Sequence, residues 1–186
     1  MAQLSVIMFG PLFSLAERRF NDQLAAAINR LSGARLWVIL PQDEAENFKT
    51  DNGYDFEKLY LHNLANAGNY QLAVAILDGS DADSGTCLEI GYRKGQNDNN
   101  IVVGVCTDFR GSEDGKVNAM LRICDRVIEY FGDDLNELAD LIINTLFELV
   151  ANKCDLVYLL DGPTYSISSL EIGLIEVFNK KRPHLD

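Results

Sequence analysis

The sequence lacks any apolar run long enough to cross a membrane. About twenty consecutive apolar residues are needed for a span, and no run in this chain approaches that length. The chain also lacks a basic segment ahead of its first apolar stretch, MAQLSVIMFGPLF, so we interpret that stretch as a first strand and not as a signal peptide. The length of 186 residues suffices for one domain with a buried core. No membrane partner is expected.

Positive charge and paired cysteines are also scarce. The chain has 16 Lys and Arg against 28 Asp and Glu, a formal net charge of −12. Binding to nucleic acid without sequence preference needs a basic surface, so we expect no nucleic-acid partner, whereas a neutral ligand is compatible with this charge. Cys87, Cys106, Cys124 and Cys154 form no CxxC pair. This spacing favours buried reduced thiols and predicts a cytoplasmic protein without a metal site.

Short apolar runs alternate with segments of helical periodicity. Such runs are typical of buried parallel strands, and their alternation with helices predicts a parallel sheet with right-handed crossovers. We therefore expect a single flavodoxin-like or Rossmann-like α/β domain with a central parallel five-stranded sheet flanked by helices. The strands are expected at 4–9, 36–40, 72–77, 101–105 and 126–131, and the helices at 15–31, 54–67, 86–93 and 135–149.

The segment DGSDADSGTCLEIGY, residues 78–92, carries the clearest chemical signal. It follows an apolar run, and ligands bind beyond the carboxyl ends of the strands in open α/β sheets. Asp83 and Glu89 lie six residues apart. If the loop folds back, they form a pair able to supply a nucleophile and a hydrogen-bonding or acid/base partner at a sugar carbon. Two simpler interpretations stay open: the acidic loop is only solvated, and Ser84 is only a helix N-cap.

The same segment resembles the signature of the nucleoside 2-deoxyribosyltransferase family. In that family an Asp-containing loop leads into a Gly-Thr step and a Glu-Ile-Gly-Tyr helix, and the resemblance extends in order over roughly the first 130 residues. It implies that Glu89 is the nucleophile and that Asp83 contacts the sugar. Asp83 is also a candidate proton donor to the leaving base.

The resemblance implies further substrate-binding residues. GPLFSLAERRFN is similar to the family's first loop and helix, where small residues such as Gly10 let the substrate approach the backbone. Phe13 is a candidate for an apolar floor beneath the C2 atom of a 2-deoxy sugar. Gln42 matches a glutamine that contacts the base in family members. Asp78 and Gly85, from the signature itself, complete this part of the set.

Two residues of the segment TDFRGSEDGKVNAML match side chains that reach into the pocket of a neighbouring subunit in the family. They are Asn118 and Met120, and the match implies a homo-oligomer in which they complete the adjacent site. Considered alone, Asn118 is more typical of the N-cap of a short helix than of a residue that reaches into a neighbouring subunit.

The chain departs from the family at two positions. Family members often carry a tyrosine in the first strand that orients the glutamate, but Val6, Ile7 and Met8 stand here and cannot hydrogen-bond through their side chains. Tyr92 is a possible substitute. Asn63 appears where the family has an aspartate that contacts the base, and an amide both donates and accepts whereas ionised aspartate only accepts. We keep Asn63 as a substrate-binding residue without carrying over the family's base preference.

Residues 43–53 and the C-terminus carry less information. The polar, acidic segment 43–53 predicts a mobile loop over the pocket. We place the main domain at 1–153 and an extension of uncertain role at 154–186. The extension echoes the strand, loop and helix of the signature, but it has no counterpart of Asp83, so we do not assign Glu171 to a site.

The resemblance implies a nucleoside 2-deoxyribosyltransferase that acts through a covalent deoxyribosyl-glutamate intermediate with retention of configuration. The implied partners are 2′-deoxyribonucleosides and free nucleobases, with no cofactor. Two alternatives stay open: an N-glycosidase for deoxynucleoside 5′-monophosphates, and a non-catalytic nucleotide-binding module on the same fold.

Overall fold

The structure is a computed structural model that describes residues 3–97, 99–109 and 118–161, with side chains described as far as Lys153. Within these ranges no helix is long and apolar enough to span a lipid bilayer.

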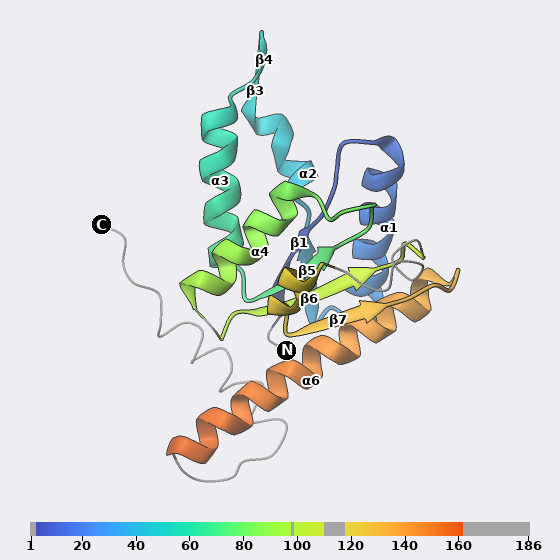
Figure 1. The fold of residues 1–186 in the computed structure, drawn as a ribbon, viewed down its shortest axis with the longest axis vertical. Helices are drawn as coiled ribbons and strands as arrows, with labels where there is room; N and C mark the ends of the chain where they lie inside the picture. Colours follow the sequence, from blue (N-terminus) through green and yellow to red (C-terminus); the bar gives the residue numbers. More distant parts are fainter. Residues whose placement is uncertain (1–2, 98, 110–117, 162–186) are drawn as a thin grey trace.

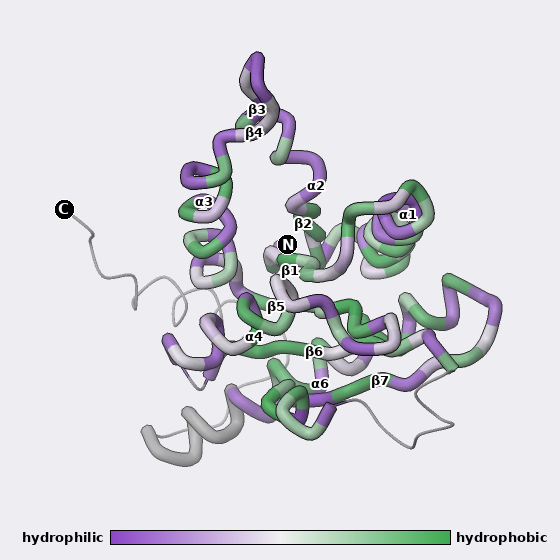
Figure 2. The backbone as a smooth tube through the Cα atoms, turned by 45° about the horizontal axis from the view of Figure 1, so that its top comes forward, coloured by the Kyte–Doolittle hydropathy of each residue, from purple (hydrophilic) through white to green (hydrophobic). Residues whose placement is uncertain are grey.

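A five-stranded parallel sheet forms the centre of the molecule (Figure 1). Its strand order is β2-β1-β5-β6-β7, which is the flavodoxin-like order, so the predicted fold class is confirmed. Hydropathy along the chain is highest in the inner strands (Figure 2), whose residues are buried on both faces. The strands are β1 (Leu4–Phe9), β2 (Leu36–Ile39), β5 (Leu72–Ile76), β6 (Ile101–Cys106) and β7 (Arg126–Glu129).

Helices cover both faces of the sheet. Helices α1 (Leu15–Leu31) and α6 (Leu135–Asp161) pack together on one face, where Leu24, Ile28 and Ile142 are fully buried. Helices α3 (Phe56–Asn69) and α4 (Ser84–Gln96) cover the other face, together with the short 3₁₀ helix η2 (Ala119–Ile123). Odd and even positions of β1 therefore point into two separate apolar clusters, as the period of a strand requires.

Helix α1 begins and ends where the sequence predicts. The Ser14 side chain accepts a hydrogen bond from the backbone N–H of Glu17, and the Glu17 carboxylate accepts one from the backbone N–H of Ser14, which completes the capping box. After the helix, Gly33 adopts a φ of +62° that favours glycine. Helix α3 begins at Phe56, later than predicted, because Asp55 caps it by accepting from the backbone N–H of Lys58.

Residues 41–54 are structured, so the predicted mobile loop at 43–53 is wrong. They form α2 (Pro41–Glu44), the 3₁₀ helix η1 (Ala45–Phe48) and a hairpin of β3 (Lys49–Thr50) and β4 (Gly53–Tyr54) that projects at the top of Figure 1. The Glu44 carboxylate binds this segment to α3, because it accepts from Asn66 at 2.8 Å and lies 2.6 Å from His62 Nε2. Glu44, one of the polar residues that suggested a loop, instead makes these contacts with α3.

The C-terminal extension begins as a helix and not as a strand. Helix α6 continues through residues 154–161, so the strand expected there is wrong, and the domain boundary proposed at 153/154 falls inside α6. A short apolar run such as LVYLL is compatible with either a strand or a buried helix. The remainder of the expected extension, including Glu171, lies outside the described residues.

Arg93 fixes α4 at the end of the sheet opposite to the loops that follow β1 and β5. Its fully buried guanidinium donates hydrogen bonds to the backbone carbonyls of Ala67, Tyr70, Gln71 and Ile101, at 2.9 to 3.3 Å. Burial lowers the pKa of Arg93 to about 10, which leaves the group charged at neutral pH. The carbonyls satisfy that charge and join α4 to the C-terminal end of α3 and to the starts of β5 and β6.

Candidate active site

The candidate site lies where the strand order reverses, between the carboxyl ends of β1 and β5. The chain leaves β1 through Gly10, and a Cβ atom placed on Gly10 would lie 2.9 Å from Cβ of Ile76 in β5. Glycine is therefore needed there for steric reasons, since real Cβ atoms do not approach other carbons so closely. This contact brings the loop from β1 next to the loop from β5, while an approach of substrate to the backbone at Gly10 stays a prediction.

Asp83 caps helix α4, so the expectation that Ser84 is the N-cap is wrong. Asp83 Oδ2 accepts hydrogen bonds from the backbone N–H of Thr86 at 2.9 Å and from its hydroxyl at 3.1 Å. Gly85 lies beneath the same carboxylate, and a Cβ there would lie 3.0 Å from Oδ2. The Ser-Gly-Thr step thus holds one oxygen of the predicted sugar-contacting aspartate.

Glu89 occupies the second turn of α4 and is half-buried. Burial, together with the negative charge of Asp83, raises the pKa of its carboxyl to about 7. Nothing within the described ranges hydrogen-bonds this carboxylate. The structure therefore brings Glu89 and Asp83 close enough to interact electrostatically, and leaves the Glu89 oxygens available for a reacting group.

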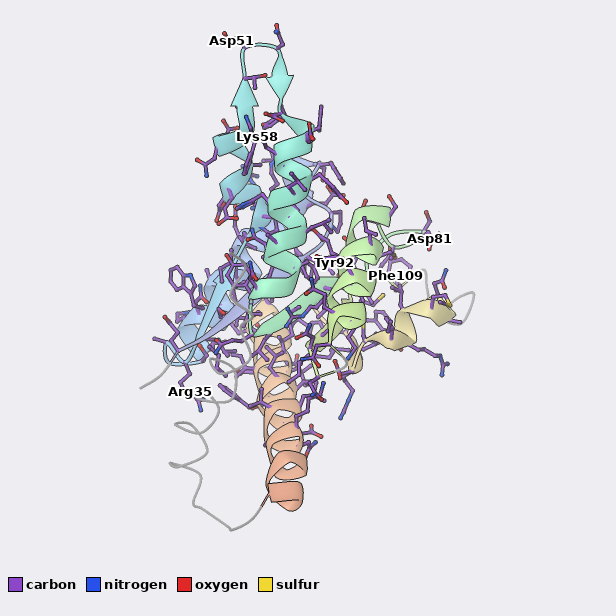
Figure 3. The ribbon with its side chains drawn as sticks, turned by 90° about the vertical axis from the view of Figure 1, so that its left-hand side faces the viewer. Arg35, Asp51, Lys58, Asp81, Tyr92 and Phe109 are labelled. Atoms are coloured by element: carbon purple, nitrogen blue, oxygen red, sulfur yellow. The ribbon has the colours of Figure 1, made fainter. Side chains whose placement is uncertain are left out.

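No tyrosine orients Glu89 from the first strand. Met8 and Ile7 are buried in the two apolar clusters on opposite faces of β1. Tyr92, one turn after Glu89, is 37% exposed, and the structure gives no hydrogen bond between the two side chains. Figure 3 shows Tyr92 on α4 and Asp81 in the loop that precedes this helix.

Asp78, at the end of β5, is held by the neighbouring loop. Its Oδ1 accepts from the backbone N–H groups of Thr107 and Asp108, at 2.5 and 3.0 Å, and its Oδ2 accepts from the Thr107 hydroxyl at 2.5 Å. Asp108 in turn accepts from the backbone N–H of Gly79 at 3.3 Å. These bonds fix the β5 and β6 loops to each other, which is the contribution that the structure shows for Asp78.

Gln42 is bound to helix α1. Its side-chain Nε2 donates to the carboxylate of Asp22 at 2.6 Å and to the carbonyl of Arg18 at 3.1 Å, and its Oε1 accepts from Asn21 at 3.1 Å. Asn21 is buried and also donates to the carbonyl of Pro11. Gln42 therefore anchors the first loop, and a base contact would require its amide to exchange partners.

The remaining predicted residues differ in exposure. Phe13 and Met120 are 73% and 80% exposed. Asn118 caps η2 by accepting from the backbone N–H of Met120 at 3.0 Å, so the simpler interpretation of Asn118 is confirmed. Asn63 is half-buried on α3.

Sequence reasoning missed two residues that hold the site loops. Arg18 donates to the carbonyls of Leu12 and Phe13 at 3.1 and 2.7 Å and so fixes the loop that carries Phe13. Thr86 binds Asp83, as described above. The signal for Thr86 was its position three residues after an aspartate at a helix start, which is the spacing of a cap and its acceptor. No sequence signal distinguished Arg18 from Arg19.

In the part of the chain that the structure describes, no three His, Cys, Asp or Glu side chains are grouped so that they could hold a metal ion.

A comparison with known protein families identifies one that this sequence matches. A sequence model of the family named nucleoside 2-deoxyribosyltransferase matches residues 8–138. No curated protein matches the chain in sequence.

Two solved structures resemble the fold. A conserved protein from Enterococcus faecalis V583 is 24% identical, with a TM-score of 0.59 over 75% of this chain and 96% of that one. A 2-deoxyribosyltransferase from Bacillus psychrosaccharolyticus is 16% identical, with a TM-score of 0.52 over 73% of this chain and 90% of that one. At such identities the likeness concerns the fold alone.

Proposed function

The chain belongs to the nucleoside 2-deoxyribosyltransferase family, and from this premise we propose that it exchanges the base of 2′-deoxyribonucleosides through a covalent deoxyribosyl intermediate on Glu89. The observation that carries the proposal is the state of Glu89. Its carboxylate is half-buried at the switch point of the sheet, has no hydrogen-bond partner within the described ranges, and lies beside the charge of Asp83. A surface glutamate without a chemical role would not need this arrangement.

The proposed reaction uses Glu89 as the nucleophile and involves two nucleobases, one that leaves the sugar and one that replaces it. An oxygen of ionised Glu89 forms a bond to C1′ of the deoxyribose while the N-glycosidic bond breaks and its electron pair leaves with the first base. The ring nitrogen of a second base then attacks C1′ from the opposite side and displaces the Glu89 carboxylate, and that base loses its proton to water. Two inversions retain the configuration at C1′.

Asp83 is better suited to stabilise charge than to donate a proton. Both hydrogen bonds from Thr86 end on Asp83 Oδ2, which accepts in each of them. An ionised Asp83 stabilises the positive charge that develops on the sugar as the glycosidic bond breaks. We therefore assign Asp83 to sugar contact and charge stabilisation, and we assign protonation of the leaving base to water.

The proposed substrate is neutral. Asp81 lies in the loop before α4. Burial raises the pKa of the Cys87 thiol, and the charges of Asp81 and Asp83 raise it in the same direction. These charges disfavour a phosphate beside Glu89 and support a nucleoside over a nucleoside 5′-monophosphate.

We assign the remaining substrate contacts to residues of the first loop and of α3. We propose that the substrate lies against the backbone at Gly10 and against the ring of Phe13, and that Asn63 contacts the base. The high exposure of Met120, next to Asn118, supports a role for both in the pocket of a neighbouring subunit of a homo-oligomer. We also propose that residues 1–153 carry the whole site in a cytoplasmic protein of nucleotide salvage.

The test is base exchange. Purified protein is incubated with 2′-deoxyinosine and free adenine, and the products are separated by chromatography alongside the Glu89→Ala variant and an exposed control on α3, Glu57→Ala. We expect new 2′-deoxyadenosine with the wild type and the control, and none with Glu89→Ala. Free hypoxanthine without a new nucleoside would instead identify a hydrolase. No turnover with purine or pyrimidine deoxynucleosides or their monophosphates would contradict an enzymatic role.

A further inference from the structure

Asp83 is held by two hydrogen bonds where a helix cap needs one. A capping aspartate is satisfied by a single backbone N–H, which Thr86 supplies at 2.9 Å. The hydroxyl of Thr86 adds a second bond to the same atom, Oδ2, at 3.1 Å. Thr86 is only 1% exposed, so this hydroxyl is shielded from water and donates to Asp83.

We propose that Thr86 is a positioning residue that holds the Asp83 carboxylate in one orientation, with Oδ2 committed to the start of α4 and Oδ1 left for the substrate. This inference rests on the proposed function and deepens it. It assigns to the buried Thr86 hydroxyl a role beyond the stability of the helix.

Gly85 supports this arrangement. Because a Cβ on Gly85 would lie 3.0 Å from Asp83 Oδ2, the absence of a side chain there leaves room for the carboxylate over the first turn. Thr86 fixes the carboxylate from within the helix while Gly85 leaves its position unobstructed. Together they determine which of the two carboxylate oxygens is available.

The orientation of Asp83 also affects Glu89. Among the described residues, Asp83 is the charged group whose field raises the pKa of Glu89, in addition to the effect of burial. A carboxylate that could rotate would change both the contact with the sugar and this field. A fixed carboxylate keeps both constant through the reaction, as preorganised catalytic groups do.

The first test compares Thr86→Val, which removes the hydroxyl, with Thr86→Ser, which keeps it. We expect Thr86→Val to lower kcat about tenfold, equivalent to ~1.4 kcal/mol of transition-state free energy, while KM changes little and Thr86→Ser retains most of kcat. The control is Asp55→Ala, which removes the cap of α3 away from the site. Thermal unfolding is measured for all three variants. Equal kcat in Thr86→Val and wild type, or a fall in Thr86→Ser as large as in Thr86→Val, would overturn the proposal.

A second measurement does not depend on turnover. The pKa of Glu89 is followed by carbon-13 NMR of protein labelled at the glutamate carboxyl, with Glu89→Gln used to assign the signal. We expect a lower pKa for Glu89 in Thr86→Val and in Asp83→Asn than in wild type, and an unchanged one in Thr86→Ser. If wild type fails to exchange bases, the proposed function fails while this titration still decides the role of Thr86. An unchanged titration in Thr86→Val would refute that role.

Discussion

Replacing Glu89 by glutamine should change how stability depends on pH, because ionisation of this half-buried carboxyl is unfavourable in the folded protein. Its pKa is raised from 4.5 to about 7 on folding. Between these two values the folded state binds more protons than the unfolded state, so the free energy of unfolding falls as pH rises, and it levels off above the folded-state pKa. Glutamine stays neutral and lacks this dependence.

The size of the effect follows from the two pKa values. Each pKa unit corresponds to ~1.4 kcal/mol, and the interval from 4.5 to about 7 gives at most about 3 to 4 kcal/mol. Since Glu89 keeps some contact with solvent, we expect about 2 kcal/mol. The stability of Glu89→Gln relative to wild type should therefore rise by that amount between about pH 4.5 and about pH 8.

Urea unfolding at matched protein concentration measures this difference. The contributions of the other titrating groups cancel, because both proteins contain the same groups. The control is Glu17→Gln. Hydrogen bonds at the start of α1, with the backbone N–H of Ser14 as the main cause, lower the pKa of Glu17. Its relative stability should change in the opposite direction and at lower pH, since that contribution is present above the unfolded-state pKa and lost on acidification. A stability difference for Glu89→Gln that is the same at every pH would refute the reasoning about burial.

Three further substitutions test the framework of the site. Gly10→Ala places a Cβ 2.9 Å from Cβ of Ile76. We expect it to lower the free energy of unfolding, measured by thermal unfolding, by about 1 to 3 kcal/mol. Arg93→Met leaves buried backbone carbonyls without a donor and should lower stability to urea by roughly 3 kcal/mol. Asp78→Ala removes the oxygens that accept from the backbone N–H and the hydroxyl of Thr107, so hydrogen exchange at the Thr107 amide should become faster while the sheet amides keep their protection.

The sheet and the helices that flank it could be predicted because their signals are local. The apolar runs gave the five strands, and Ser14 with Glu17 gave the start of α1. Where the signal was composition alone, the prediction was wrong. The polar segment 43–53 folds because Glu44 meets His62 on α3, a contact between distant residues that no local pattern reveals. The apolar residues after Lys153 suited a strand as well as a helix.

The proximity of Asp83 and Glu89 could be predicted from the sequence, but the burial of Glu89 could not. The signature gave Asp83 and Glu89, and the strand order gave their place in the sheet. The cap formed by Asp83 was missed because Ser84 is an equally good capping residue in sequence. The raised pKa of Glu89 depends mainly on burial, which arises only when α4 packs on the sheet. The same holds for Gln42, whose amide is occupied by contacts with α1.

The most direct test of the central claim is to trap the glycosyl-enzyme. The protein is mixed with 2′-deoxyinosine without an acceptor base, quenched in acid within the first turnover, digested and examined by mass spectrometry. We expect a peptide that contains Glu89 to gain the mass of one 2-deoxyribosyl group, with fragmentation placing the ester on Glu89, and we expect no adduct in Glu89→Gln. An adduct on Asp83, or base release by wild type with no adduct at any time, would contradict the account.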